Sequence, residues 1–214
     1  MREALEASRR TLGDEHPHAL ISINSLGLLL HYQGKLDEAE LLYREVLEAR
    51  RRTLGDEHPS TLTSINNLGG LLQDQGKLDE AEPLLREALE ARRRTLGDEH
   101  PSTLGSINNL GMLLLRARGK LDEAEPLLRK ALEGLRRTLG DEHPSTLVSI
   151  NNLGYLFKKQ GKYDEAEPLM REALEGLRRT LGDAHPATLG SITQRANIDP
   201  TVSFERQVVQ AAAT

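Results

Sequence analysis

Apolar residues recur along the chain at a helical period, in stretches separated by turn residues. Residues 59–73 place their apolar side chains three or four positions apart, on one face of a helix: Leu62, Ile65, Leu68 and Leu72. A second apolar face follows in 78–94: Leu78, Ala81, Leu85, Ala88 and Leu89. Pro59 suits a first helical position, Gly76 lies in the turn, and Gly97 favours a left-handed helix end. The pattern predicts two amphipathic helices joined by a tight turn.

This two-helix segment is repeated. The hexapeptide Leu-Gly-Asp-Glu-His-Pro begins at Leu12, Leu54, Leu96 and Leu139, and returns at Leu181 with Ala184 in place of glutamate. The intervals are 42 residues, with one of 43. Self-similarity at a fixed period of this size indicates stacked repeats, in which each repeat buries its apolar face against its neighbours. We therefore predict an all-α solenoid of helix-turn-helix repeats.

The period also sets the expected boundaries. The solenoid should span 1–192, as a half repeat at 1–11, full repeats at about 12–53, 54–95, 96–138 and 139–180, and a partial repeat at 181–192. The half repeat suggests either a fragment of a longer array or an uncovered face, at Ala4 and Leu5, that docks a partner or a second copy. Residues 193–214 are expected to be a divergent tail or a capping helix.

Composition and charge narrow the partners. The formal charge is −5, with 29% charged residues of interleaved sign, which argues against nucleic acid or an anionic membrane as partner. There is no cysteine, no secretory signal, and no run near the roughly 20 apolar residues of a membrane span. A cytoplasmic protein is the expectation. Glutamate and arginine recur four residues apart on each second helix, and we expect them to form ion pairs: Glu40–Arg44, Glu48–Arg52, Glu82–Arg86, Glu90–Arg94, Glu125–Arg129, Glu133–Arg137, Glu167–Arg171 and Glu175–Arg179.

The repeated Asp-x-His motif was tested as a metal or catalytic site. Each repeat carries one such histidine: His16, His58, His100, His143 and His185. Stacked helices lie about 8–10 Å apart, too far for successive histidines to share one zinc ion, and one repeat offers too few ligands. We expect the aspartate to cap the next helix instead. No phosphate-binding loop or nucleophile motif is present, so neither cofactor nor metal nor catalytic site is predicted.

The residues match the tetratricopeptide pattern at Ile65, Leu68-Gly69, Leu72, Ala81, Leu85 and Ala88, with Ile65 where that family often has tryptophan. The longer period, Asn-Asn-Leu-Gly, and Gly-Lys-Leu-Asp-Glu-Ala-Glu-Pro resemble the extended repeats of kinesin light chains and nephrocystin-3-type proteins. The resemblance covers roughly 1–192. It implies a right-handed superhelix whose first helices line a concave groove that binds extended peptides.

Carried over repeat by repeat, the resemblance assigns groove positions. They are Asn24, Asn66, Asn108 and Asn151; one turn later Leu28, Gly70, Met112 and Tyr155; and then His31, Gln73, Leu115 and Lys158, with Tyr32, Asp74, Arg116 and Lys159 beside them. The asparagines could pair with a peptide backbone, or instead with neighbouring repeats. Asn67, Asn109 and Asn152 are expected to serve the second purpose. Arg116, Lys158 and Lys159 predict an acidic stretch in the ligand.

The function predicted from the sequence is a non-catalytic scaffold or adaptor that binds a peptide segment of a partner protein. Two alternatives remain open at this point. One is a structural array that self-associates end to end, and the other is the sensor segment of a larger signalling ATPase. The heptad coiled coil that joins kinesin light chains to the motor is not found in this sequence.

Overall fold

The predicted helix pairs are present in the structure, a computed structural model that describes residue 13, 15–117 and 120–195. Those residues contain no β-strand. Each first helix, here called helix A, alternates with a second, helix B. The A helices are α2 (Pro17–Tyr32), α4 (Pro59–Asp74), α6 (Pro101–Arg116), α8 (Pro144–Lys159) and α10 (Pro186–Arg195). The B helices are α3 (Leu36–Leu54), α5 (Leu78–Leu96), α7 (Leu121–Leu139) and α9 (Tyr163–Leu181).

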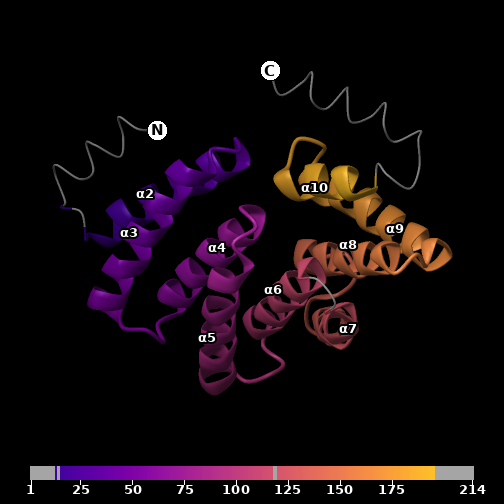
Figure 1. The fold of residues 1–214 in the computed structure, drawn as a ribbon, viewed down its shortest axis with the longest axis horizontal. Helices are drawn as coiled ribbons and strands as arrows, with labels where there is room; N and C mark the ends of the chain where they lie inside the picture. The colour runs from indigo at the N-terminus through magenta and orange to yellow at the C-terminus, as the bar shows by residue number, and fades with distance from the viewer. Residues whose placement is uncertain (1–12, 14, 118–119, 196–214) are drawn as a thin grey trace. The chain divides into compact units, whose positions relative to one another are not determined.

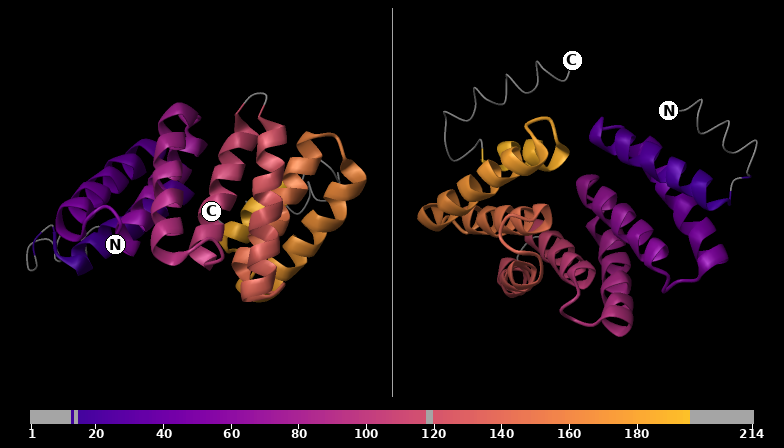
Figure 2. Two further views of the ribbon diagram at one scale, coloured as in Figure 1. Left: turned by 90° about the horizontal axis from the view of Figure 1, so that it is seen from below. Right: turned by 180° about the vertical axis from the view of Figure 1, so that it is seen from behind.

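The chain divides into two units at Gly97, and each unit has the same local architecture. In the first unit α2 packs on α3 and α4 on α5, while α3 also contacts α4. In the second unit α6 packs on α7 and α8 on α9, and α8 contacts α6, α7 and α10. Helix A packs on the helix B that follows it in the pairs α2–α3, α4–α5, α6–α7 and α8–α9. Figure 1 labels these helices, and Figure 2 shows them from two further sides. Each unit is therefore a stack of helical hairpins.

Local sequence fixes where helix A begins and ends. His58 is extended, with φ −64° and ψ 137°, because proline follows it, and Pro59 opens α4. At the other end Gly76 has φ +77°, and the amides of Gly76 and Lys77 donate to the carbonyls of Gln73 and Leu72 at 3.1 and 2.8 Å. This is a Schellman ending, which reverses the chain into helix B. Gly97 ends α5 with φ +83° as predicted, although its ψ of 165° sends the chain straight into the linker.

The core lies between the paired helices, and glycine allows their close approach. Leu62, Ile65, Leu68 and Leu72 are all 1% exposed or less. A Cβ atom built on Gly69 would lie 2.7 Å from Leu85 Cδ2, so a larger residue here would require the leucine side chain to shift. The same holds for Gly27 against Tyr43 and for Gly111 against Leu128. The hairpin is thus defined by side-chain size as well as by apolar period.

Half of the expected ion pairs form within a helix. They are Glu40–Arg44, Glu82–Arg86, Glu125–Arg129 and Glu167–Arg171, at 2.8, 2.7, 2.9 and 3.8 Å. The prediction for the other arginines is wrong, because they bind the glutamate of the linker that opens their own repeat: Arg52 to Glu15, Arg94 to Glu57, Arg137 to Glu99 and Arg179 to Glu142. An antiparallel hairpin returns the last turn of helix B to the start of helix A. Such exposed pairs each contribute about 0–1 kcal/mol.

Glu40 joins one repeat to the next in the first unit. Its carboxylate accepts hydrogen bonds from Lys77 Nζ at 2.8 Å, Gln75 Nε2 at 2.9 Å and Arg44 Nε at 2.9 Å. The bond from Lys77 contributes most to lowering the pKa of Glu40 from its ordinary value of 4.5 to about 2. Glu125 occupies the same position in the second unit and is bound by Gln160 and Arg129, which lower its pKa in the same direction.

The Glu40 cluster predicts an acid-sensitive contribution to stability. Because the folded-state pKa is depressed, the contribution is complete above the ordinary value of 4.5 and is lost as the pH falls towards about 2. We expect Glu40→Gln to lower the melting temperature at neutral pH. The difference in melting temperature between the wild type and the variant should shrink as the pH falls through that window. Thermal melts followed by circular dichroism at several pH values measure this. A gap that stays constant with pH would contradict the assignment.

Two predicted segments lie largely outside the described residues. The half repeat at 1–11, including Ala4 and Leu5, lies wholly outside them, as does 196–214 of the expected tail. Residues 193–195 continue α10. The extra residue of the third repeat falls beside 118–119, which are also outside the description. Ala117, the last residue described before that gap, is extended, with φ −73° and ψ 134°.

Candidate functional site

The repeats of this chain differ at several positions of both helices, and the varying positions of helix A lie mainly on one face. Across α4, α6 and α8 the Ser-Ile-Asn-Asn-Leu-Gly core is unchanged. One buried position changes from Leu72 and Leu114 to Phe157, and four more positions vary at a spacing of i, i+7, i+10 and i+11. This spacing places them along one side of a helix. We call these positions the variable stripe: Thr63, Gly70, Gln73 and Asp74 in α4; Gly105, Met112, Leu115 and Arg116 in α6; Val148, Tyr155, Lys158 and Lys159 in α8; and Ile21, Leu28, His31 and Tyr32 in α2.

In the second unit the variable stripe is basic. Neither α6, α8 nor α10 contains an aspartate or glutamate. Lys159 is exposed, and its Nζ lies 5.2 Å from the centre of the half-buried Tyr155 ring; Lys158 Nζ lies 5.9 Å from the same ring. Burial, and secondarily the charge of Lys159, lowers the pKa of Lys158. Arg116 is exposed on α6, while Met112 is buried at 8% exposure. The arrangement provides clustered positive charge beside an aromatic face.

The first unit has a different variable stripe. On α2, Ile21, Leu28 and Tyr32 are exposed apolar residues, at 53%, 38% and 56%. Facing them across the hairpins, His31 Nε2 and Asp74 Oδ2 lie 2.8 Å apart and link α2 to α4. Nothing lies within 4 Å of a Cβ atom built on Gly70. This surface is therefore apolar with a single acidic group, in contrast to the basic stripe of the second unit.

The asparagines of helix A pair with neighbouring repeats, which is the structural alternative that the sequence left open. Asn67 Nδ2 donates to Asn24 Oδ1 at 3.0 Å, and Asn152 Nδ2 donates to Asn108 Oδ1 at 3.3 Å. Asn66 donates to the Leu62 carbonyl of its own helix at 2.8 Å. The asparagines named as groove residues are half-buried at Asn24 and nine-tenths or more buried at Asn66, Asn108 and Asn151. These amides fix the spacing of adjacent A helices.

Gln194 continues this pairing in α10, and the sequence reasoning missed it. It stands where the earlier repeats have their second asparagine, so the loss of the Asn-Leu-Gly signature concealed it. Asn151 Nδ2 donates to Gln194 Oε1 at 2.6 Å, and Ser191 Oγ donates to Asn151 Oδ1 at 2.9 Å. Lys158 Nζ donates to the Gln194 carbonyl at 2.5 Å. The shared amide chemistry of asparagine and glutamine was the available signal.

The linkers perform a structural role that the sequence assigned to the wrong residue. The aspartate was expected to cap helix A, but the histidine ring does so, and Asp56, Asp141 and Asp183 bind arginines of helix B instead. Within the described ranges, no group of three or more histidine, cysteine, aspartate or glutamate side chains is placed to hold a metal ion.

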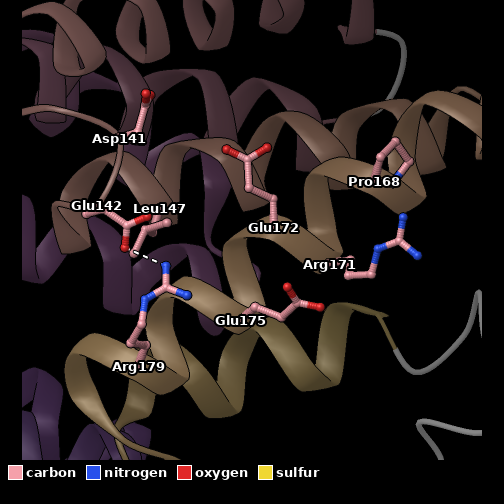
Figure 3. Close-up of a pocket in the computed structure, with 8 residues that line it drawn as sticks. All are labelled: Asp141, Glu142, Leu147, Pro168, Arg171, Glu172, Glu175 and Arg179. Carbon is pink, nitrogen blue, oxygen red and sulfur yellow. Dashed lines mark hydrogen bonds and ion pairs between the residues drawn. The ribbon is translucent and has the colours of Figure 1, made fainter.

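A pocket of about 240 Å³ lies beside the fourth linker rather than on the variable stripe (Figure 3). It is lined by Asp141, Glu142, Leu147, Pro168, Arg171, Glu172, Glu175 and Arg179. Arg179 binds Glu142 at 2.5 Å, and Arg136 binds both Asp141 and Glu172 at 2.9 and 3.2 Å. Three of the carboxylates are thus paired with arginines of α7 and α9, and the pocket offers no nucleophile with an adjacent base.

Comparison with known families and structures decides the relationship. The tetratricopeptide repeat matches residues 103–179 in one form and residues 1–18, 20–60 and 61–102 in a second. The chain belongs to the tetratricopeptide repeat family. No curated protein sequence matches it.

Solved structures place the chain near kinesin-light-chain-type repeats. The nearly identical TPR-like repeats ascribed to a kinesin light chain of Podosopora anserina are 32% identical over 92% of each chain, with a TM-score of 0.63. BtubC (BKLC) from P. vanneervenii is 24% identical over 98% of this chain and 84% of that one, with a TM-score of 0.67. A Rap protein is 15% identical over 98% and 57% of the two chains, with a TM-score of 0.76. The last two share the fold.

Tetratricopeptide repeats are protein–protein interaction modules, and they are generally non-catalytic. The fold therefore suggests a scaffold. Among the helices in the described part of the chain, none combines the length and apolar character needed to cross a membrane.

Proposed function

We propose that this tetratricopeptide repeat protein is a non-catalytic scaffold that binds an extended, acidic segment of a partner protein along α6 and α8. The variable stripe carries the proposal. In a stack of near-identical repeats, constant residues can hold the fold while a row of variable helix A residues, part of it exposed, selects a ligand. In the second unit that face carries Arg116, Lys158 and Lys159 and no carboxylate.

The chemistry of the stripe defines the ligand. Carboxylates of the bound segment would pair with Lys159 and Arg116, and would compete with the Gln194 carbonyl for Lys158. An apolar side chain of the ligand would contact the Tyr155 ring and the edge of Met112. The predicted groove asparagines Asn108 and Asn151 support this site by holding α8 at a fixed distance from its neighbours. One protein of this fold, Rap, has been solved in complex with a competence and sporulation factor, so the fold accommodates a partner.

The proposal is tested by giving repeat four the residues of repeat two. The double variant Lys158→Gln/Lys159→Asp installs the pair found at Gln73 and Asp74, which a hairpin of this chain already carries. The probe is a fluorescein-labelled peptide of alternating glutamate and leucine, followed by anisotropy. We expect its affinity to fall at least about tenfold, because loss of close charge pairs costs on the order of 1.4 kcal/mol or more.

A matched control separates this site from general charge. Lys130→Glu changes the charge of α7 by −2, compared with −3 for the double variant, at a position where the equivalent residues are Glu87 and Glu172. The affinity of this control variant for the same peptide should equal that of the wild type at about 0.15 M salt, where distant exposed charges are screened. Equal weakening by both variants, or unchanged binding by the double variant, would remove the basic stripe as the binding site.

A further inference from the structure

One side-chain hydrogen bond recurs at the start of each A helix. The ring Nδ1 of the linker histidine accepts a hydrogen bond from the backbone N–H two residues later, at 3.1–3.2 Å, in all of His16, His58, His100, His143 and His185. The following proline holds each histidine backbone extended, as at His143 with φ −70° and ψ 136°. The imidazole therefore takes the place that serine, threonine, aspartate or asparagine usually occupies at a helix start.

This geometry determines where the ring proton lies. A backbone N–H can only donate, so Nδ1 must present its lone pair and the neutral ring must carry its proton on Nε2. Adding a proton at Nδ1 would set two hydrogens against each other and break the cap. It would also place a positive charge at the positive end of the helix dipole, which is unfavourable. The cap therefore exists only with a neutral ring.

The carboxylates near each histidine do not stabilise its protonated ring, because they are already paired with other cations. The carboxylates nearest in sequence belong to the same linker, and cations of the B helices already bind them. The pairs are Asp56–Arg51 and Glu57–Arg94 beside His58; Asp98–Lys130 and Glu99–Arg137 beside His100; Asp141–Arg136 and Glu142–Arg179 beside His143; and Asp183–Arg178 beside His185. His16 stacks on His18 at 5.4 Å, and Glu15 of its linker binds Arg52.

We propose that the histidine linkers are proton-sensitive joints, in which mild acid releases the start of every A helix at once. Histidine ordinarily changes charge between about pH 5 and 8, the range in which cellular compartments differ. A single lost cap has a modest effect, but the same group is repeated twice in the first unit and three times in the second. The stack would then loosen on acidification within a narrow pH interval, with its apolar core unchanged. This inference stands independently of the peptide proposal.

Nuclear magnetic resonance tests the bond directly. The backbone amides of Ser60, Ser102 and Ser145 donate to the ring Nδ1 of the histidine in their own linker. Their chemical shifts should therefore change as acid protonates that histidine. In His143→Asn, the cap is kept by a group that does not titrate. In that variant the chemical shift of the Ser145 amide should no longer depend on pH, whereas the shifts of the Ser60 and Ser102 amides should still change. Amides that ignore pH in the wild type would overturn the proposal.

Thermal melts test the consequence for the whole chain. The variant with asparagine at all five capping histidines should lose less than half as much melting temperature on acidification as the wild type does. His18→Asn, which removes an exposed histidine that caps no helix, should lose as much as the wild type. An acid-induced shift of equal size in the five-site variant would show that the linkers are not the sensitive element.

Discussion

Gly154→Val is expected to destabilise the second unit by about 3 kcal/mol, because overpacking a close helix crossing strains a core that has no free volume. A Cβ atom at this position in α8 would lie 2.6 Å from Met170 Cγ and 3.2 Å from the backbone oxygen of Ala166. The methionine could move, but the carbonyl belongs to the helix itself. The two axes of the α8–α9 hairpin would have to separate. Urea unfolding followed by circular dichroism measures the loss.

The same substitution in an open position is the control for that result. Gly105 is also a glycine inside helix A of the second unit, but nothing lies within 4 Å of a Cβ atom built there. Repeat four carries Val148 at the equivalent position. Gly105→Val should therefore leave stability within about 0.5 kcal/mol of the wild type. Similar losses in the two variants would show that helix propensity, and not the crossing distance, explains the effect.

Arg50→Ala is expected to cost about 3 kcal/mol in the first unit. Arg50 is only 8% exposed, and its Nη1 donates to the Ser60 carbonyl at 2.9 Å and to Ser64 Oγ at 2.8 Å. Burial lowers the pKa of its guanidinium. Alanine would leave a cavity between α3 and α4 and would remove both donors to the next repeat.

Two comparisons show whether the Arg50 effect has this origin. Arg52→Ala removes an exposed arginine of the same helix and should change stability by less than about 1 kcal/mol. In the second unit, Leu135 stands where Arg50 does, and Ser149 Oγ is buried without a hydrogen-bond partner among the described residues. Ser149→Ala should therefore be neutral or stabilising, whereas Ser64→Ala should destabilise. Equal losses of stability in Arg50→Ala and Arg52→Ala, or in Ser64→Ala and Ser149→Ala, would contradict a stabilising role for the buried Arg50 contacts.

The architecture was accessible from the sequence because the period and the apolar stripes express the same physical requirement. A repeat of 42 residues has room for two helices, and each helix must bury one face. Gly76 and Gly97 then mark boundaries because they adopt a positive φ that few other residues allow, and Pro59 marks one because it holds the preceding residue out of the helical region. The positions of the core residues Leu62 and Ile65 follow directly.

The linker contacts were not accessible in the same way. Several acceptors compete for one donor, and the choice depends on how the hairpin closes. Arg179 could reach Glu175 along its own helix, yet it binds Glu142 because the return of α9 brings that linker within 2.5 Å. Asp141 and His143 could both cap α8, and the arginine of the preceding helix B takes the aspartate. Pattern alone does not rank such alternatives.

The sequence was enough to predict that α8 carries two adjacent lysines, but not which groups those lysines contact. The sequence places Lys158 and Lys159 on α8, and periodicity assigns both to one face. The contact of Lys158 with the Gln194 carbonyl depends on α10 continuing the stack, although its signature is lost.

The amide pairing between neighbouring A helices has a genetic consequence. The A helices α4, α6 and α8 each carry two adjacent asparagines for this pairing, as Asn66 and Asn67 in α4. Unequal recombination that inserts or deletes one whole copy would therefore join two surfaces that already match. Arrays of this kind can lengthen or shorten by whole copies without new compensating mutations, while their exposed stripes diverge.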